Sequence, residues 1–342
     1  MAAQSGTKAS AVEIHHSALA EFAYKHHAAV LVVKNRRHPE LVFESMPAAS
    51  AIGFSFLYHG LFGHRGVLDS KQVERKHDPG RKYDSPINVL HRIRNFVRAY
   101  RVDCDDLLEP DLSRYATLND FFYRKLREGA RPIADPADPL VVSSAADCRL
   151  TVFPTIDVAR KHWIKGRHFT LGELLSDEKL AKRFEHGSIA IFRLAPADYH
   201  RYHSPVDATV GATRHFQGKY YTVNSLIVRD PRFDPLGENK RDITLLSHSR
   251  AEGPDSLVAF VQVGALLVSS IRQTVRESVR VKRGDELGYF AYGGSTIVCA
   301  FEEPIDWDQD LLRNSMGQNA QLKMPLETMV RMGERIGKWR RT

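Results

Sequence analysis

Ser295 follows two glycines and could attack the backbone carbonyl group that precedes it. The surrounding stretch, Gly288–Phe301, is predicted to form two short apolar strands joined at a Gly293-Gly294-Ser295 corner. Because glycine adopts backbone angles that other residues resist, the Gly294 carbonyl could be held in an unusual orientation beside the Ser295 hydroxyl. A chain that cleaves itself needs this arrangement. Taken alone, however, the stretch is more typical of a β-hairpin whose glycines form the turn.

A serine hydroxyl attacks a peptide carbonyl when a nearby base takes its proton, and a third group normally orients that base. Two histidines, His200 and His203, lie three residues apart after an apolar strand, and Asp147 lies in a turn of small residues. Asp147, His203 and Ser295 could therefore form an Asp–His–Ser set that only folding brings together. The residue types alone indicate a hydrolase-like or self-processing site.

Each of these residues also has a simpler interpretation. The two histidines could be polar residues at the end of a strand. An HxxH pair could also bind a metal ion, although no third ligand lies at an informative spacing. Asp147 could cap a turn, which is the commonest role of an aspartate in such a place. On the residues alone these alternatives stay open.

The part of the chain that must position these residues is predicted to be rich in strands. From Leu140 onward, short β-type runs alternate with turns of Gly, Pro and Asp, with one clear helix at Leu174–Phe184 and a closing helix at Leu322–Trp339. Irregularly spaced strands without repeated βα units indicate an antiparallel or mixed sheet. The predicted strands are Leu150–Phe153, Ser188–Phe192, Tyr220–Val223, Ile243–Leu246, Leu257–Val263, Leu266–Val268, Tyr289–Tyr292 and Thr296–Phe301.

The first 115 or so residues are predicted to be helical and basic. Helices are expected over Ala11–Val33 and from Ser45 to Phe62, with a charged loop at Gly63–Tyr83. A helix capped by Ser85 carries an apolar stripe at helical spacing, and a capping box at Thr117 opens another helix that runs to Leu126. The stripe comprises Val89, Leu90, Ile93, Phe96, Val97 and Tyr100, and arginines 92, 94, 98 and 101 occupy the rest of that helix. Such a helix packs on a core or lies on an anionic bilayer.

The predicted fold class is therefore α+β. A helical N-terminal region, residues 1–115, is expected to pack on a mixed or antiparallel β-rich catalytic domain, residues 116–342. The two parts together are long enough to bury a sizeable core.

The charge and the cysteine content of the chain indicate which kind of partner and which compartment suit it. The formal charge of +8 favours an anionic partner, and because no nucleic-acid motif is present we favour a membrane surface over nucleic acid. The three cysteines, Cys104, Cys148 and Cys299, are too few for a disulfide framework or a zinc site, which favours an intracellular, reducing compartment. No apolar run reaches the length of a membrane-spanning helix. The first 39 residues have a composition faintly like an organelle presequence, although two acidic residues weaken that interpretation.

Eight segments resemble, in order, the phosphatidylserine decarboxylase proenzyme family, whose cleavage motif is Gly-Gly-Ser-Thr. Together they cover roughly residues 85–303, and although each is a weak signal, eight in the family's order are specific. The segments are Thr117–Pro132, Ala146–Arg149, Trp163–Gly166, Leu194–Pro205, Tyr220–Asn224, Gly237–Arg241, Val263–Ala265 and Lys282–Gly288, the last leading into Gly293-Gly294-Ser295-Thr296.

The resemblance implies that the chain is a zymogen that cleaves itself. The His203–Asp147 pair would activate Ser295, whose hydroxyl would attack the Gly294 carbonyl. Cleavage would give a large subunit, residues 1–294, and a small subunit, residues 295–342, in which Ser295 has become a pyruvoyl group. That group would form a Schiff base with phosphatidylserine and act as the electron sink for carbon dioxide loss. His200 would then protonate the carbanion to give phosphatidylethanolamine. This chemistry requires neither pyridoxal phosphate nor a metal.

The resemblance also implies a cellular location and a subunit composition. We expect a peripheral enzyme of an endomembrane or mitochondrial membrane, or a cytoplasmic one, that keeps its cleaved small subunit and forms a homodimer. Two alternatives are a soluble pyruvoyl-dependent decarboxylase of aromatic amino acids and a non-catalytic, lipid-binding relative. The joint presence of Asp147, His200, His203, Gly294 and Ser295 argues against the second, because a binding module needs none of them as a set.

Overall fold

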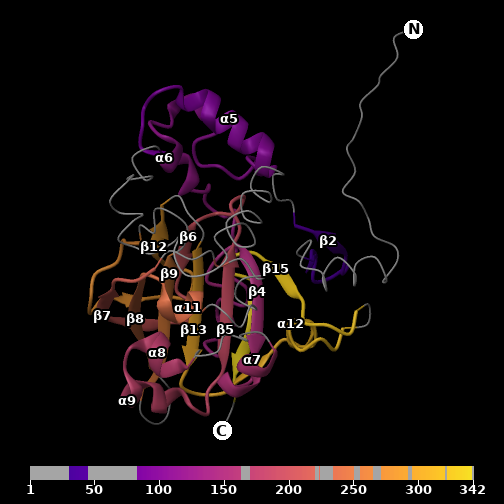
Figure 1. Cartoon of the computed structure of the whole chain (residues 1–342), viewed down its shortest axis with the longest axis vertical. Coiled ribbons are helices and arrows are strands. Elements are labelled where there is room, and N and C mark those ends of the chain that lie inside the picture. Colours follow the sequence, from indigo (N-terminus) through magenta and orange to yellow (C-terminus); the bar gives the residue numbers. More distant parts are fainter. Residues whose placement is uncertain are drawn as a thin grey trace, which may run out of the picture.

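The largest element of the fold is a ten-stranded mixed sheet (Figure 1). The computed structural model describes residues 31–44, 83–162, 170–219, 223, 234–249, 255–264, 271–291, 295–319 and 322–340. Neighbouring strands of the large sheet run antiparallel, except β1 and β15, which are parallel. In order across the sheet, the strands are β11 (Arg280–Val281), β7 (Ala208–Phe216), β8 (Arg241–His248), β9 (Ser256–Gly264), β13 (Ser295–Phe301), β5 (Ile189–Leu194), β4 (Cys148–Phe153), β15 (Glu327–Val330), β1 (Leu31–Val33) and β2 (Leu41–Phe43).

Two three-stranded sheets and several short helices accompany the large sheet. One small sheet is β10 (Ile271–Gln273), β12 (Glu286–Phe290) and β6 (Arg201–His203); the other is β14 (Ile305–Trp307), β16 (Arg335–Trp339) and β3 (Val141–Ser143). The helices are α5 (Val89–Tyr100), η1 (Leu112–Arg114), α6 (Leu118–Phe122), α7 (Ile156–His162), α8 (Leu171–Leu175), α9 (Glu178–Ala181), η2 (Lys182–Phe184), α11 (Pro235–Glu238) and α12 (Gln309–Ser315).

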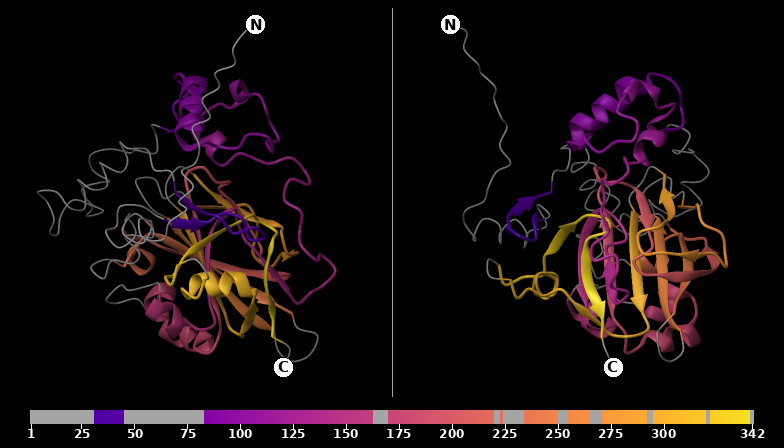
Figure 2. Two further views of the ribbon diagram at one scale, coloured as in Figure 1. Left: turned by 90° about the vertical axis from the view of Figure 1, so that its right-hand side faces the viewer. Right: turned by 180° about the vertical axis from the view of Figure 1, so that it is seen from behind.

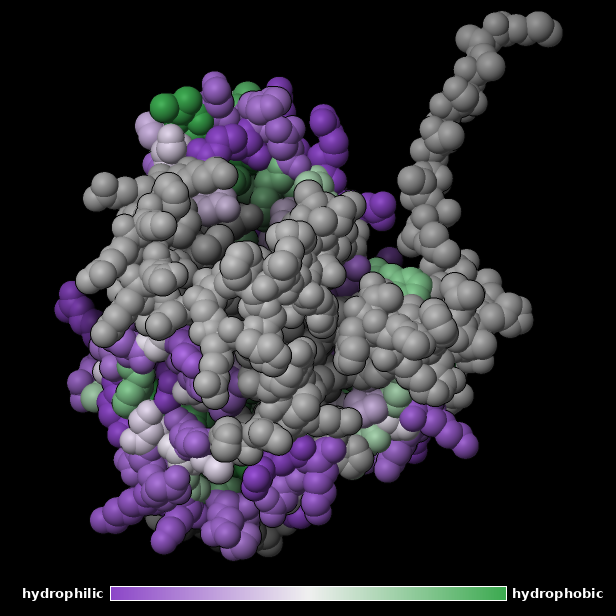
Figure 3. Space-filling view, in the orientation of Figure 1, coloured by the Kyte–Doolittle hydropathy of each residue, from purple (hydrophilic) through white to green (hydrophobic). Residues whose placement is uncertain are grey.

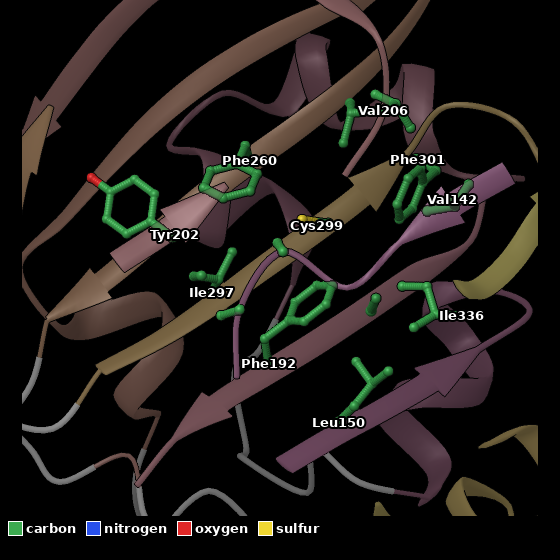
Figure 4. Packing of buried hydrophobic residues seen from close by; sticks show 14 of the residues in the cluster. Val142, Leu150, Phe192, Tyr202, Val206, Phe260, Ile297, Cys299, Phe301 and Ile336 are labelled. Carbon is green, nitrogen blue, oxygen red and sulfur yellow. The ribbon is translucent and has the colours of Figure 1, made fainter. Parts of the chain in front are cut away.

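Strand β13 lies in the middle of the core and is buried along its whole length. Alternate side chains of a strand point to opposite faces, so β13 contributes to two separate clusters. Ile297, Cys299 and Phe301 pack with side chains of the two small sheets, as Figure 4 shows for part of the cluster. Val298 and Ala300 pack on the other face, with side chains of α7, α8 and η2. Burial on both faces explains why β13 is a continuous apolar run after its first two residues.

Helices α5 and α6 form a small lobe with its own core at one end of the strands (Figures 1 and 2). In this lobe, residues 83–126, Phe96 of α5 meets Phe121 and Phe122 of α6 edge to face, with ring centres 6.2 and 6.1 Å apart. The apolar stripe predicted on α5 is thus turned into the lobe. The predicted boundary near residue 115 falls between these two packed helices, and the division of the chain there remains a prediction.

The predicted fold class is confirmed, as are the strands that correspond to β4, β5, β8, β9 and β13. The predicted helix at residues 89–100 is also present, but Asn88 rather than Ser85 occupies its N-cap position, without a side-chain hydrogen bond. Thr117 caps α6 as predicted, yet α6 ends at Phe122, because Leu126 instead pairs with Leu107 in a β-bridge.

Three other helix predictions are wrong. Leu322–Trp339 forms strands β15 and β16, separated by a turn in which Gly333 has a φ of +85° that favours glycine. Leu174–Phe184 is divided into short helices because Ser176 adopts a left-handed conformation and Asp177 caps a new helix. Residues 31–33, predicted as the end of a helix, form β1 between β2 and β15. Helix α12 was not predicted.

Other predictions lie outside the described residues: the helices over 11–30 and 45–62, the loop over 63–82, and the strands at 220–222 and 266–268. In the part of the chain that the structure describes, we find no helix both long enough and apolar enough to span a bilayer.

Candidate active site

Ser295 is the first residue of β13 and is fully buried. It pairs with Leu194 of β5 on one side and with Gly264 of β9 on the other. Pairing on both sides fixes the backbone of Ser295, so the direction of its side chain is set by the sheet. Gly294, whose carbonyl belongs to the predicted cleavage bond, lies outside the described residues, as does Gly293.

His200 is the histidine in contact with Ser295. Its Nδ1 atom lies 3.0 Å from the Ser295 hydroxyl, and its Nε2 atom lies 3.0 Å from the carbonyl oxygen of Ala195. A carbonyl oxygen can only accept a hydrogen bond, so the ring proton is on Nε2. In the neutral ring Nδ1 is then an acceptor, and the Ser295 hydroxyl donates to it. The contact is therefore already oriented for proton transfer from Ser295 to His200.

The surroundings of His200 keep it neutral. Burial lowers the pKa of His200 to about 3, nearby Arg124 and Arg149 add to this effect, and the hydrogen bond to Ala195 opposes it. Phe122 of α6 stacks on the imidazole with ring centres 3.8 Å apart, so the lobe covers one face of the base. At neutral pH the ring is unprotonated at Nδ1, which is the state that a general base requires.

His203 has different partners. Its Nδ1 atom donates to the Gly284 carbonyl oxygen at 2.9 Å, and its Nε2 atom accepts from the Tyr199 hydroxyl at 3.1 Å. Burial lowers the pKa of His203. Among the described residues no hydrogen bond joins His203 to Ser295.

Asp147 pairs with an arginine. Arg131 donates to its two carboxylate oxygens from Nε at 2.9 Å and from a terminal nitrogen at 2.6 Å, and the Met332 backbone N–H donates at 2.8 Å. No hydrogen bond between Asp147 and His203 occurs in the described part of the chain. The negative charge of Asp147 is nevertheless close enough to favour protonated His203. The structure thus joins His200 directly to Ser295, and the Asp147–His203–Ser295 set remains a prediction.

Sequence reasoning missed several residues of this site: Phe122, Arg124, Arg131, Ala195 and Tyr199. All five lie inside segments that resemble the family, and this resemblance could have pointed to them. Their residue types alone indicate no role in the site. The described residues hold no cluster of three or more His, Cys, Asp or Glu side chains suited to a metal ion.

The comparisons with known proteins agree with one another. A family model described as phosphatidylserine decarboxylase matches residues 118–338. The chain is 41% identical over 316 residues to "Phosphatidylserine decarboxylase proenzyme 3" of Schizosaccharomyces pombe, covering 91% of this chain and 31% of that protein. It is 34% identical over 306 residues to "Phosphatidylserine decarboxylase proenzyme" of Fusobacterium nucleatum, covering 88% of this chain and 95% of that protein. A protein of the same name from Chlamydia trachomatis is 41% identical over 247 residues, or 72% of this chain and 77% of that one. The chain thus spans about a third of the fungal relative and nearly all of the Fusobacterium one.

Proposed function

The chain belongs to the phosphatidylserine decarboxylase family, and on that premise we propose that it cleaves itself between Gly294 and Ser295 and then converts phosphatidylserine to phosphatidylethanolamine. The observation that carries this proposal is the 3.0 Å contact between the Ser295 hydroxyl and the unprotonated nitrogen of buried His200. A serine in a merely structural strand needs no neutral base at its hydroxyl.

The first chemical step is an acyl shift. His200 takes the proton of the Ser295 hydroxyl, and the oxygen attacks the Gly294 carbonyl carbon. The amide C–N bond then breaks as His200 passes that proton to the nitrogen, which leaves an ester and a free amine on Ser295. Loss of the Ser295 α-proton then breaks the ester C–O bond and releases the Gly294 carboxylate. The dehydroalanine that remains takes up one water molecule and loses ammonia to give the pyruvoyl group. The alternative assignment of the first proton transfer to the Asp147–His203 pair stays a prediction, and comparison of variants of the two histidines separates the assignments.

The site fits a pyruvoyl group. Ser295 is buried at the end of a central strand, where a ketone in its place would be held rigidly and shielded from water. That ketone supplies an electrophile for the substrate amine and accepts the electron pair that carbon dioxide leaves behind. His200 lies beside the reacting position and would return a proton to the substrate carbon.

The sheet would retain the small subunit after cleavage. Residues from 295 onward contribute β13, which lies between β5 and β9; β15, which lies between β4 and β1; and β16, which pairs with β3. A buried ion pair between Arg193 of β5 and Glu327 of β15, at 2.8 and 2.6 Å, adds a link between the two subunits. A homodimer is an expectation from the family resemblance.

Substrate identity is tested with purified wild-type protein. We expect phosphatidylserine vesicles to yield phosphatidylethanolamine and carbon dioxide, whereas Ser295→Ala gives neither, because it lacks the precursor of the ketone. Free tryptophan and tyrosine in the same assay are the control substrates. If they are decarboxylated and the vesicles are not, the chain is a soluble amino-acid decarboxylase. If cleaved protein acts on none of these, the decarboxylase proposal fails.

We also propose that the lobe meets an anionic membrane surface through charge. Because the apolar stripe of α5 is buried in the lobe, this helix presents Arg94 and Arg98, and its C-cap presents Arg101, rather than an apolar face. Figure 3 shows mostly hydrophilic residues on the described surface of the lobe, together with apolar residues at its upper left edge and along its lower border. Each basic residue near an anionic surface contributes roughly 1 kcal/mol.

Replacing Arg94, Arg98 and Arg101 by glutamine is expected to weaken binding to phosphatidylserine-rich vesicles about a hundredfold at low salt. Vesicle co-sedimentation measures this. The control replaces three exposed lysines, Lys161, Lys179 and Lys182, on the helices at the opposite end of the strands in Figure 1. Equal losses in both triple variants would show that net charge, not the lobe, attracts the membrane.

A further inference from the structure

A cluster of buried charged side chains is linked to the turn that precedes His200. Arg149 of β4 and Arg193 of β5 occupy directly opposite positions on neighbouring antiparallel strands. Like charges placed directly opposite are destabilising unless an anion lies between them. Glu44, which follows β2, supplies that anion: its two carboxylate oxygens lie 2.7 Å from the Arg149 Nε atom and 2.9 Å from a terminal nitrogen of Arg193. The side chains of all three residues are 8% exposed, so water does little to screen these charges.

The same Arg149 pairs with Asp198, and Asp198 holds the backbone of the His200 turn. The Asp198 carboxylate accepts the Ala195 N–H at 2.7 Å, and the Asp198 N–H donates to the Ala195 carbonyl oxygen at 2.9 Å. That carbonyl oxygen is the one that accepts the Nε2 proton of His200. Asp198 therefore fixes the acceptor that decides which nitrogen of His200 carries the proton.

We propose that Asp198 is a positioning residue for the His200–Ser295 pair, and that Glu44 acts with it through Arg149. Without the negative charge of Asp198, the Ala195 N–H keeps only a neutral acceptor and Arg149 loses an anion. The turn can then relax, and its carbonyl no longer holds the Nε2 proton. A ring that carries its proton on Nδ1 instead cannot accept the proton of Ser295. The proposal rests on self-cleavage at Ser295, the proposed function, for its kinetic readout.

Glu44 connects the N-terminal segment to the active site. The family model matches residues 118–338, and Glu44 lies well before them, in the region predicted to be a separate helical part. The segment 31–44 instead adds two strands to the large sheet and a carboxylate to its buried charges. We therefore assign this segment to the catalytic unit.

The kinetic test uses the full chain made in a cell-free reaction, so that the uncleaved form is present at the start and its conversion is followed on a gel. We expect Asp198→Asn to slow self-cleavage about tenfold or more, a part of the 10²–10⁴-fold that a general base contributes. Glu44→Gln should slow it by a smaller factor, and the double variant should be no slower than Asp198→Asn, since both residues act on one turn. Glu40→Gln, an exposed glutamate on the same segment, should cleave at the wild-type rate.

The pH profile separates positioning from general loosening of the fold. His200 is packed against Phe122 and Ser295, with the charges of Arg124 and Arg149 nearby. If only its position changes, the rate falls by the same factor from pH 5 to 8. If the variants simply admit water, the pKa of His200 rises toward its ordinary value near 6.5, and the rate falls further below that pH. Such a new pH dependence, wild-type rates in both single variants, or additive effects in the double variant would overturn the proposal.

A second readout does not depend on cleavage. In the Ser295→Ala chain, ¹⁵N NMR of labelled histidine should find His200 as a single Nε2–H tautomer, and Asp198→Asn should convert it to a mixture. An unchanged tautomer overturns the proposal, whether or not the wild-type chain cleaves. A wild-type chain that never cleaves contradicts the proposed function but not this proposal. If Asp198→Asn does not fold in this background, Glu44→Gln decides: an unchanged tautomer and a wild-type rate contradict the proposal.

Discussion

Replacing Ser295 by alanine is expected to leave the chain in one piece, whereas the wild-type chain separates into residues 1–294 and 295–342. The hydroxyl of Ser295 is the only atom of that side chain that can attack the Gly294 carbonyl, so its removal abolishes the acyl shift altogether. Intact-mass spectrometry under denaturing conditions measures this outcome. The small fragment of the wild type should carry the mass of a pyruvoyl terminus rather than of a serine.

The control for this experiment is Ser256→Ala. Ser256 begins β9, the strand next to β13, and its buried hydroxyl has no hydrogen-bond partner among the described residues. Losing it should not affect cleavage.

Under native conditions the two wild-type fragments should elute together in gel filtration, because three strands of the small subunit pair with strands of the large one. A wild-type chain that is folded and stays whole would contradict the proposed function.

Replacing His200 by alanine is expected to slow self-cleavage by 10²–10⁴-fold, roughly the contribution of a general base. His203→Ala is the matched comparison, and we expect a smaller effect, because the side chain of His203 bonds to Tyr199 and Gly284. The time course of fragment formation measures both rates. If His203→Ala is the slower of the two, the Asp147–His203 pair is the base that acts on Ser295.

The pH dependence of the wild-type rate provides a further check on His200. If His200 is the base as proposed, its active form is the neutral ring, and burial lowers the pKa of His200 to about 3. Protonation would therefore remove activity only as the pH falls toward that value, and the rate should be level from pH 5 to 8. A histidine with an ordinary pKa of about 6.5 would lose roughly thirtyfold between pH 8 and pH 5.

The sequence indicated the chemistry of the site better than its geometry. Ser295 and His200 were both singled out, but they are 95 positions apart, and two histidines three residues apart were equally plausible partners. In the folded chain His200 is the one that reaches the serine, with its ring also bonded to the Ala195 carbonyl. Glu44 and Arg131 were not found, because ion pairs between distant segments leave no periodic pattern along the chain.

The same reasoning applies to the fold. The runs that became β5, β9 and β13 were predicted because they are buried strands with long apolar stretches. The strands β15 and β16 were missed because their short segments contain lysine, arginine and glutamate, which favour a helix in isolation. Pairing with β4 and β3 outweighs that preference.

The strand order also fixes when the chain can act during its production. A ribosome releases β5 and β9 before β13, yet β13 lies between them, and the early strand β1 pairs with β15, which emerges later still. A nascent chain that stops before β13 has a gap at the centre of its sheet and no hydroxyl for His200. The proposed self-cleavage must therefore follow translation of at least β13, so that a chain that stops before this strand cannot form the proposed ketone.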